Sequence, residues 1–385
     1  MIENCGVEYI VSKHEGEETA SLNFVFPQVS SVEFRNLPEL KSFYPSKHTT
    51  EWPKLKRLDV YHCEKLWLFS PEYVIHSYED SRLDVPDLQM PLVLVEKVLP
   101  NLEIMSLKEE DITMISYSNI SPADLFSKTK FLLVQCFHSE SAVMPLDFLE
   151  RIHDVEKLGI GCSYFPELIP YRGGGKYTGI FTRIRYLRLD TLPWIQHVGI
   201  HGSQFESALQ NLETLEVWFC DGLTSLTPSS VSFPNLKTLD IWGCKSLMTL
   251  VTSSAARRLE QLTEMRIREC EMLREVVSTE GDETEEEIVF GKLRRIEFDG
   301  LSNLCFFCSS NCRFKFPALE EMIVNKCHGL VIFCEGVLST PLLSRVWLTK
   351  ECHEWRWEGD LNATVCMLYQ ERLAAGTSDR SHIQS

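Results

Sequence analysis

The cysteines are the residues of this sequence best suited to chemistry, because a thiolate is both a nucleophile and a metal ligand. The chain has 14 of them. Cys305, Cys308 and Cys312 follow one another closely in LSNLCFFCSSNCRFKFP, and Cys327 and His328 come shortly afterwards. Spacing of this kind can hold zinc or part of an iron–sulfur cluster. A metal site here is therefore one of two hypotheses.

The second hypothesis is that the thiols pack in a core. One position of a recurring pattern holds Cys5, Cys63, Cys136, Cys220, Cys244, Cys270 and Cys327, while Leu37, Leu192 and Leu301 fill it in other copies, and Cys162 and Cys352 fall one residue out of register. A position shared by Cys and Leu favours a compact, weakly polar, buried side chain. Phe306 and Phe307 likewise indicate a core segment around Cys305. We expect reduced, packed thiols, with no metal and no cofactor.

Other chemical motifs are incomplete or missing. YRGGGKYTG fails the phosphate-loop pattern G-x-x-x-x-G-K-(S/T), because Pro170 replaces its first glycine and Tyr177 replaces the hydroxyl that binds Mg²⁺. We interpret this stretch as a turn. The sequence has no G-x-S-x-G, H-E-x-x-H, protein-kinase or dinucleotide-binding motif. We therefore expect no catalytic residues and no enzymatic activity.

Composition narrows the classes of partner. The chain has 385 residues, of which 44% are hydrophobic, so it is typical of a folded protein. A net charge of −17 argues against sequence-independent nucleic-acid binding, which needs an excess of Lys and Arg. We find neither an apolar run long enough to span a membrane nor a secretory signal. We expect a cytoplasmic or nuclear protein.

A repeated apolar pattern organises the sequence and would position these residues. FPQVSSVEFRNLPEL, WPKLKRLDVYHCEKL and FPNLKTLDIWGCKSL share the template F-P-x-L-x-x-L-x-(I/V/F)-x-x-(C/L)-x-x-L. Its second apolar position falls at Val32, Leu58, Met105, Phe131, Leu158, Leu187, Leu215, Leu239, Met265, Ile296, Met322 and Val346. Most neighbours lie 24 to 31 residues apart, with one gap of 47. This period and pattern are the leucine-rich-repeat signature.

The pattern predicts an α/β fold. Apolar residues two positions apart share one face of a short strand, and stacked copies form a parallel sheet over a common core. We expect a leucine-rich-repeat solenoid (horseshoe) with a parallel concave sheet and an irregular convex side with few short helices, starting near Ser121, Pro145 and Ser253. The expected domains are a solenoid over 1–358 with about 12 repeats, the first truncated; a capping helix over 359–375; and a flexible tail over 376–385.

The outward positions of the strands are candidates for binding. Trp218 and Trp242 fall in one outward column on adjacent copies, next to Phe219. Exposed aromatic side chains are typical of protein-binding hot spots. We predict a concave protein-binding face that includes Trp218, Phe219, Trp242, Arg188, Arg266, Arg268, Tyr61 and Trp347. The alternatives are that the aromatic side chains shield one another, and that the charged column from Arg188 to Glu297 is only a solvated ladder.

These features together resemble a known family. The alternation of L-x-I-x-x-C-x-x-L with L-x-L-x-x-L-x-x-L, the F-P-x-L starts, the acidic run before IVFGKLRRIEF and the ending CHEWRWEGDLNATVCMLYQE look like plant disease-resistance receptors of the CC-NB-ARC-LRR type. The resemblance implies a region that binds a pathogen effector or a guarded host protein and restrains an NB-ARC nucleotide switch. It does not extend nucleotide binding to this chain.

The resemblance also suggests how the ends and insertions are used. MIENC matches the second half of a repeat, so we expect the chain to be the C-terminal part of a longer receptor. The acidic run GDETEEE is either a solvated loop or a docking segment for a basic face of the NB-ARC module. The alternatives to a receptor are a substrate-recognition adaptor of the F-box type and a free-standing repeat scaffold.

Overall fold

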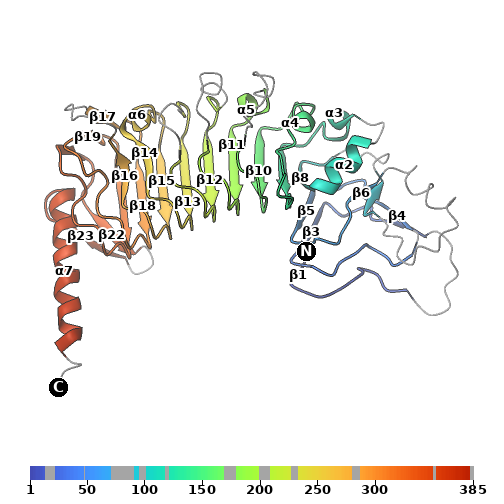
Figure 1. Ribbon diagram of the computed structural model, residues 1–385, viewed down its shortest axis with the longest axis horizontal. Helices are drawn as coiled ribbons and strands as arrows, with labels where there is room; N and C mark the ends of the chain where they lie inside the picture. The colour runs from blue at the N-terminus through green and yellow to red at the C-terminus, as the bar shows by residue number, and fades with distance from the viewer. Residues whose placement is uncertain are drawn as a thin grey trace. The chain divides into compact units, whose positions relative to one another are not determined.

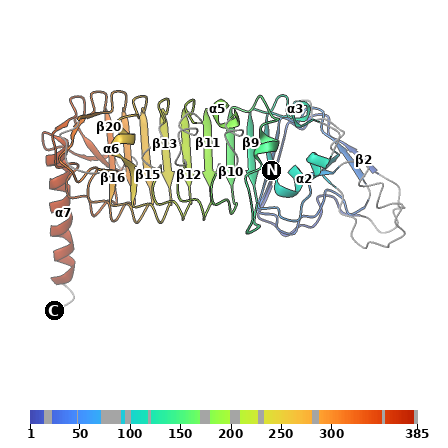
Figure 2. The same cartoon turned by 45° about the horizontal axis from the view of Figure 1, so that its top comes forward.

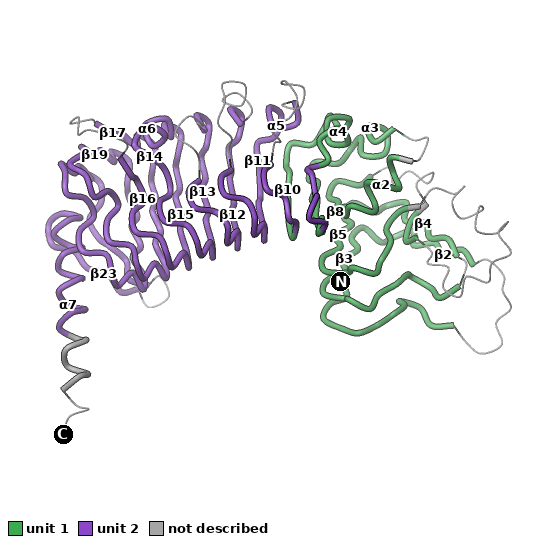
Figure 3. Tube along the Cα trace, in the orientation of Figure 1, with its two compact units in different colours: residues 1–138, 145–162 green, residues 139–144, 163–385 purple. Residues whose placement is uncertain are grey.

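The structure is a computed structural model that describes residues 1–13, 22–46, 48–70, 91–94, 101–117, 121–168, 179–198, 209–226, 233–279, 287–349 and 353–381. The chain divides into two compact units, drawn in green and purple in Figure 3. Unit 1 comprises Met1–His138 and Pro145–Cys162, and unit 2 comprises Ser139–Met144 and Ser163–Ser385. No helix in the described part of the chain is both long enough and apolar enough to cross a lipid bilayer.

Unit 1 is a parallel solenoid. Its main sheet has the strand order β1 (Ile2–Glu3), β3 (Ser31–Arg35), β5 (Arg57–Tyr61), β8 (Ile104–Lys108), β9 (Phe131–Gln135), β10 (Lys157–Gly161). Two short parallel pairs accompany it, β2 (Leu22–Val25) with β4 (His48–Glu51) and β6 (Phe69–Ser70) with β7 (Val93–Leu94). Its helices are α2 (Glu109–Tyr117), α3 (Pro122–Leu125) and α4 (Leu146–Leu149).

Unit 2 repeats the same plan, and Figures 1 and 2 show its strands side by side. Its main sheet has the order β11 (Tyr186–Asp190), β12 (Thr214–Trp218), β13 (Thr238–Trp242), β15 (Glu264–Arg268), β18 (Arg295–Asp299), β20 (Glu321–Asn325), β22 (Val346–Thr349), β23 (Glu354–Arg356). Only the final pair, β22 with β23, is antiparallel. Each unit is thus the predicted leucine-rich-repeat solenoid with a parallel sheet.

Smaller sheets and helices complete unit 2. β14 (Thr249–Thr252) pairs with β16 (Glu275–Ser278), and β17 (Glu287–Val289) joins β19 (Arg313–Lys315) and β21 (Leu338–Ser339). The helices are α5 (Gly179–Arg183), α6 (Ser253–Ala256) and α7 (Leu361–Ser381). The short helices near Ser121, Pro145 and Ser253 are therefore present, whereas α2 and α5 were not predicted.

The core consists of the apolar columns that the template defines. In β12, Leu215 and Val217 are fully buried, while the residues on either side of them are half-buried. Aromatic residues at the F-P starts stack between successive copies, as in the Phe290–Phe316 pair, whose ring centroids are 5.2 Å apart. Burying one such side chain stabilises the fold by about 1.5–3 kcal/mol, so the recurring columns hold the stack together.

The C-x-x-L part of the template forms a turn. Leu223 N–H donates to the carbonyl of Cys220 at 3.1 Å, and Leu273 N–H donates to Cys270 at 3.2 Å. Each buried thiol also donates to the carbonyl two residues before it, at 3.4 Å for both Cys220 and Cys270. Burial raises the pKa of the Cys220 thiol to about 12. Cys63, Cys220, Cys244, Cys270 and Cys327 are buried core thiols, as predicted.

The register corrects one repeat. Leu132, and not Phe131, pairs with Met105 on one side and with Leu158 on the other. The buried column therefore holds Phe137 in this copy, so Cys136 lies outside it. The prediction placed Cys136 in that column because Phe131-Leu-Leu-Val134 is apolar at four consecutive positions, and a period of two cannot be assigned in such a run.

The two charged or helical features outside the repeat pattern are also clear. In unit 1, β8 runs directly into α2, whose first turn is acidic at Glu109, Glu110 and Asp111. At the C-terminus, the Asp360 carboxylate caps α7 by accepting a hydrogen bond from Ala363 N–H at 2.8 Å. The sequence placed the start of a flexible tail at residue 376, whereas α7 extends to Ser381; a single glycine inside a helix costs only about 1 kcal/mol.

Candidate functional site

The outward residues of β12 and β13 form an aromatic group on the sheet of unit 2. The register pairs Trp218 with Trp242, and their ring centroids are 5.9 Å apart at 74°. The Phe219 ring lies 4.7 Å from that of Trp242 and is 42% exposed. Both indoles are half-buried. The rings do shield one another in part, yet the group still presents an apolar edge to solvent.

Two arginines cover the indole faces. The guanidinium carbon of Arg188 lies 3.6 Å from the centroid of the Trp218 ring, and that of Arg268 lies 5.3 Å from the Trp242 ring. Cation–π contacts of this kind contribute about 0.5–1 kcal/mol at partly exposed sites. Arg188 also lies 3.6 Å from the Glu216 carboxylate. The aromatic and cationic side chains therefore support each other without a bound ligand.

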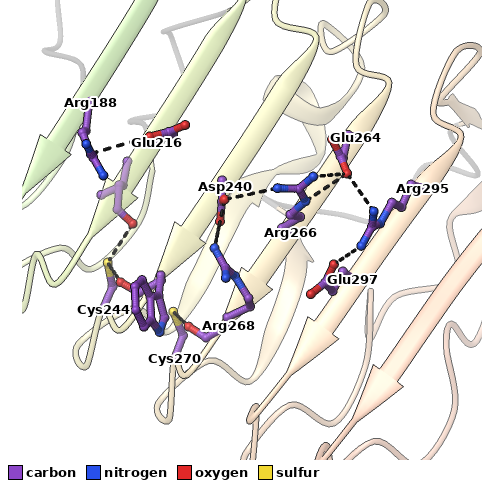
Figure 4. A network of polar contacts seen from close by, with 12 residues as sticks. Arg188, Glu216, Asp240, Cys244, Glu264, Arg266, Arg268, Cys270, Arg295 and Glu297 are labelled. Atoms are coloured by element: carbon purple, nitrogen blue, oxygen red, sulfur yellow. Dashed lines mark hydrogen bonds and ion pairs between the residues drawn. The ribbon is translucent and has the colours of Figure 1, made fainter. Parts of the chain in front are cut away.

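Asp240 links the remaining arginine to this group, as Figure 4 shows. Its carboxylate accepts two hydrogen bonds from Arg268, at 2.8 and 3.0 Å, and lies 3.7 Å from Arg266. Arg266 in turn donates to Glu264. The Asp240 side chain is only 7% exposed, so its charge is held between its two cationic partners.

A second carboxylate is fixed by a tyrosine. The Tyr186 hydroxyl donates to Glu216 Oε2 at 2.6 Å. Burial, followed by this hydrogen bond and the neighbouring negative charge, raises the pKa of Tyr186. The charged column is thus an ordered network and not only a solvated ladder. We define the aromatic surface as Trp218, Phe219, Trp242, Arg188, Arg266 and Arg268.

The structure does not bring the other two predicted residues to this surface. Trp347 lies on β22, and the strands β15, β18 and β20 stand between it and β13. It pairs with Trp355 across the antiparallel end of the sheet, and Arg345 stacks on its ring at 5.4 Å. Tyr61 belongs to unit 1, where its ring packs against His62 at 4.1 Å.

Phe219 owes its position to an unusual backbone conformation. It has a φ of 52°, and the residues at this place in neighbouring copies, Thr191, Gly243 and Glu269, also have positive φ. The N–H of Phe219 donates to the Trp242 carbonyl at 2.8 Å. This left-handed turn follows each strand and directs one side chain outward. Periodicity alone did not reveal the turn.

The closely spaced cysteines do not form a metal site in the described part of unit 2. Cys308 and Cys312 are buried, whereas Cys305 is half-buried and donates to the carbonyl of Asn303. Their sulfur atoms do not gather as a three-ligand group. The stretches 171–178 and 280–286, which include most of YRGGGKYTG and of the acidic run, lie outside the described residues, as does Cys352.

A cluster of metal-ligating residues that the sequence did not predict lies in unit 1. Cys136, His138 and Cys162 each offer one ligand atom, and these atoms lie within 4.8 Å of one another. A hydrogen bond from the Cys136 thiol is the main reason that the pKa of Cys162 is lowered, to about 5. The available signal was the pair Cys136-x-His138 together with the odd register of Cys162, but the misassigned copy hid it.

Comparison with known families agrees with the geometry. A search among curated proteins gave no match. The family model described as plant disease resistance protein RPS2-like, leucine-rich repeats, matches residues 101–233 and 229–337. The two matches together cover more than half of the chain, and they include every strand from β8 to β20. The chain therefore belongs to the leucine-rich-repeat family of RPS2-like plant disease resistance proteins.

Proposed function

We propose that this chain is the recognition region of a plant immune receptor and that its aromatic surface binds a protein ligand. The ligand would be a pathogen effector or a host protein that the receptor guards. The observation that carries the proposal is the pair of adjacent outward indoles, Trp218 and Trp242, with the exposed ring of Phe219 beside them. Tryptophan and arginine are the residue types most enriched in binding hot spots.

The composition of the aromatic surface indicates the kind of ligand. Arg188 and Arg268 lie over the indoles, so a partner that approaches the rings also meets positive charge. Because Asp240 and Glu216 hold these arginines, little side-chain entropy is lost on binding. A protein with an apolar projection and acidic residues around it suits this arrangement.

Regulation is the second part of the proposal. By resemblance to the CC-NB-ARC-LRR receptors, the repeat region also contacts an NB-ARC module, within one chain or between chains, and restrains its nucleotide switch in the cytoplasm or nucleus. We assign no catalytic role, since a repeat sheet offers an open face for another protein. The family supports this assignment at the level of an interaction region.

The test compares Trp218→Ala/Trp242→Ala with Trp347→Ala. All three tryptophans lie on outward positions of the same sheet, but Trp347 is separated from the others by three strands. Circular dichroism and thermal unfolding would establish that both variants fold. Proteins captured from plant extract by the unchanged chain would then be purified and titrated against each variant.

We expect the double variant to weaken the Kd of the true ligand by about 30-fold or more, the equivalent of a hot spot of about 2 kcal/mol. Trp347→Ala should change it by less than about 2-fold. Equal binding by all folded variants would contradict the proposal. A parallel pull-down with a co-expressed NB-ARC module tests the regulatory part, because the double variant and Trp347→Ala can affect the two partners differently.

A further inference from the structure

The turn after each strand brings two thiols together in unit 1. Gln135 at the end of β9 pairs with Gly161 at the end of β10, so Cys136 and Cys162 are the next residues on adjacent copies. Both have positive φ, 62° and 47°, as their position in the left-handed turn requires. The N–H of Cys136 donates to the carbonyls of Gly161 and Cys162, at 3.3 and 3.1 Å. The backbone therefore fixes the spacing of the two thiols.

His138 reaches the same point because of the residue before it. Phe137 enters the core and is only 4% exposed, and Cys136 and His138 flank it. His138 Nε2 lies 3.8 Å from the sulfur of Cys162. Cys136 and Cys162 are half-buried and His138 is exposed, so the cluster is open to ions from solvent.

The spacing fits a tetrahedral ion. In zinc sites, metal–sulfur bonds of about 2.3 Å and metal–nitrogen bonds of about 2.0 Å place neighbouring ligand atoms about 3.5–3.8 Å apart. The three ligand atoms here lie within 4.8 Å of one another, so small side-chain rotations would bring them to that spacing. Two sulfurs and one imidazole nitrogen form a donor set that selects zinc over magnesium or calcium.

We propose that Cys136, His138 and Cys162 form a zinc site that joins two successive repeats of unit 1. On binding, each thiol loses its proton to solvent and coordinates as a thiolate, while neutral His138 donates the lone pair of Nε2. The two thiolate charges balance the charge of Zn²⁺. Three protein ligands leave the fourth position for water. The site lies outside the aromatic surface and does not depend on the proposed function.

Cobalt titration of the full chain under reducing conditions tests the site directly. Tetrahedral Co²⁺ absorbs visible light, and thiolate ligands add charge-transfer bands in the near ultraviolet. We expect one ion per chain, displaced by Zn²⁺, and a rise in the melting temperature with Zn²⁺ because the ion binds only the folded state. Mass spectrometry of the native chain would count the bound metal.

The variants Cys162→Ser and His138→Gln should weaken Co²⁺ binding by more than about 100-fold, since even residues that only support metal ligands contribute about 10- to 100-fold. His138 is exposed, so its variant should fold even if a cysteine variant does not. Cys305→Ser is the matched control, because Cys305 is also half-buried and belongs to the rival C-x-x-C spacing. It should bind Co²⁺ unchanged.

Several results would overturn the proposal. These are absence of stoichiometric Co²⁺ or Zn²⁺ binding at micromolar free metal, equal binding by Cys162→Ser and His138→Gln, and loss of binding in Cys305→Ser. Mass-spectrometric detection of a Cys136–Cys162 disulfide in the reduced protein would overturn it as well, because the two sulfurs could not then act as thiolate ligands.

Discussion

Strands β9 and β10 of unit 1 and strands β12 and β13 of unit 2 end in the same left-handed turn, but the turns carry different chemistry. In unit 1 the turn residues are Cys136 and Cys162, and in unit 2 they are Phe219 and Gly243. The last strand residue also differs: Gln135 is buried, whereas Trp218 and Trp242 are half-buried and stacked.

The comparison separates two sets of positions in the repeat. The inward positions are apolar in both units, as with Val134 and Val217, and both are fully buried. The outward positions and the turn residue are not constrained by the core, so they hold soft ligands in one unit and aromatic rings in the other. The shared backbone determines where the side chains lie, and their types determine what the surface can bind.

A buried charge in unit 1 gives the sharpest test of this separation. Lys108 occupies an outward strand position but is buried, and its ammonium donates to the carbonyls of Cys63, Glu64 and Leu66. The Asp111 carboxylate accepts hydrogen bonds from the N–H groups of Leu68 and Lys108, at 3.1 and 3.0 Å. The outward column here is part of the structure and not a free surface.

Asp111→Ala should therefore destabilise unit 1 by about 3 kcal/mol, because two buried N–H groups lose their acceptor. Hydrogen exchange of the Leu68 and Lys108 amides would report the effect within unit 1, where a single unfolding midpoint for the whole chain would not. Thr113→Ala, on the exposed side of the same helix, is the control and should cost less than about 0.5 kcal/mol. A loss below about 1 kcal/mol in Asp111→Ala would show that this column is free after all.

The pH dependence of Asp111 follows from its burial, which raises its pKa from 3.8 to about 6. Between these values the folded state binds more protons than the unfolded state, so this group's contribution to stability falls as pH rises and is constant above about 6.5. Asp111→Asn removes that titration. The stability difference between the unchanged chain and Asp111→Asn should therefore shrink as pH rises from 4 to 6, and a rising difference would contradict the assignment.

Gly243 tests the link between the turn and the aromatic surface. Gly243 and Gly300 share a φ of 67°, but a Cβ on Gly243 would lie 2.5 Å from the Phe219 ring, whereas one on Gly300 would meet the flexible Glu269 side chain at 3.0 Å. Gly300→Ala should cost about 1 kcal/mol from backbone strain alone. Gly243→Ala should cost about 2 kcal/mol, since the ring must also move. Thermal unfolding and tryptophan fluorescence would measure both, and equal costs would break the link.

Asp240 tests whether the arginines are held before a ligand binds. Asp240→Ala should cost about 1–2 kcal/mol, because Arg266 and Arg268 lose a nearly buried partner but remain partly exposed themselves. Binding of the protein ligand should weaken as well, since Arg268 is then free to leave the Trp242 face. Unchanged stability and unchanged Kd would show that the ordering is irrelevant to recognition.

The smallest effect is expected at the surface pair Lys245–Asp221. The atoms are 3.0 Å apart, which is close to the distance between Arg268 and Asp240, but both side chains are well exposed. Lys245→Ala should change stability by less than about 0.5 kcal/mol. Chemical unfolding would measure this, and a cost as large as that of Asp240→Ala would mean that burial does not separate the two pairs.

The repeat fold could be predicted because its signal is redundant. Leu187, Leu215 and Leu239 recur in register, and β11, β12 and β13 pair as that spacing requires. The adjacency of Trp218 and Trp242 followed from the same register. The one wrong copy was the one in which Phe131 to Val134 are all apolar, because such a run gives no alternation to fix its phase.

The candidate sites were less predictable because they depend on residues outside the template. The position of Phe219 depends on a left-handed turn that most residue types can occupy here, so no glycine marks it. The approach of His138 to Cys162 depends on Phe137 entering the core, which the misassigned phase concealed. The burial of Lys108 depends on α2, which interrupts the repeat.

The turn after each strand has a further consequence. Its N–H is bonded to the carbonyl of the next copy, as with Thr191 to Trp218, Phe219 to Trp242 and Glu269 to Asp299. The main chain thus satisfies itself whatever side chain stands there, and residues as different as threonine, phenylalanine and glutamate already do so. A lineage facing a changing adversary can exchange these residues one codon at a time while the scaffold beneath keeps its shape.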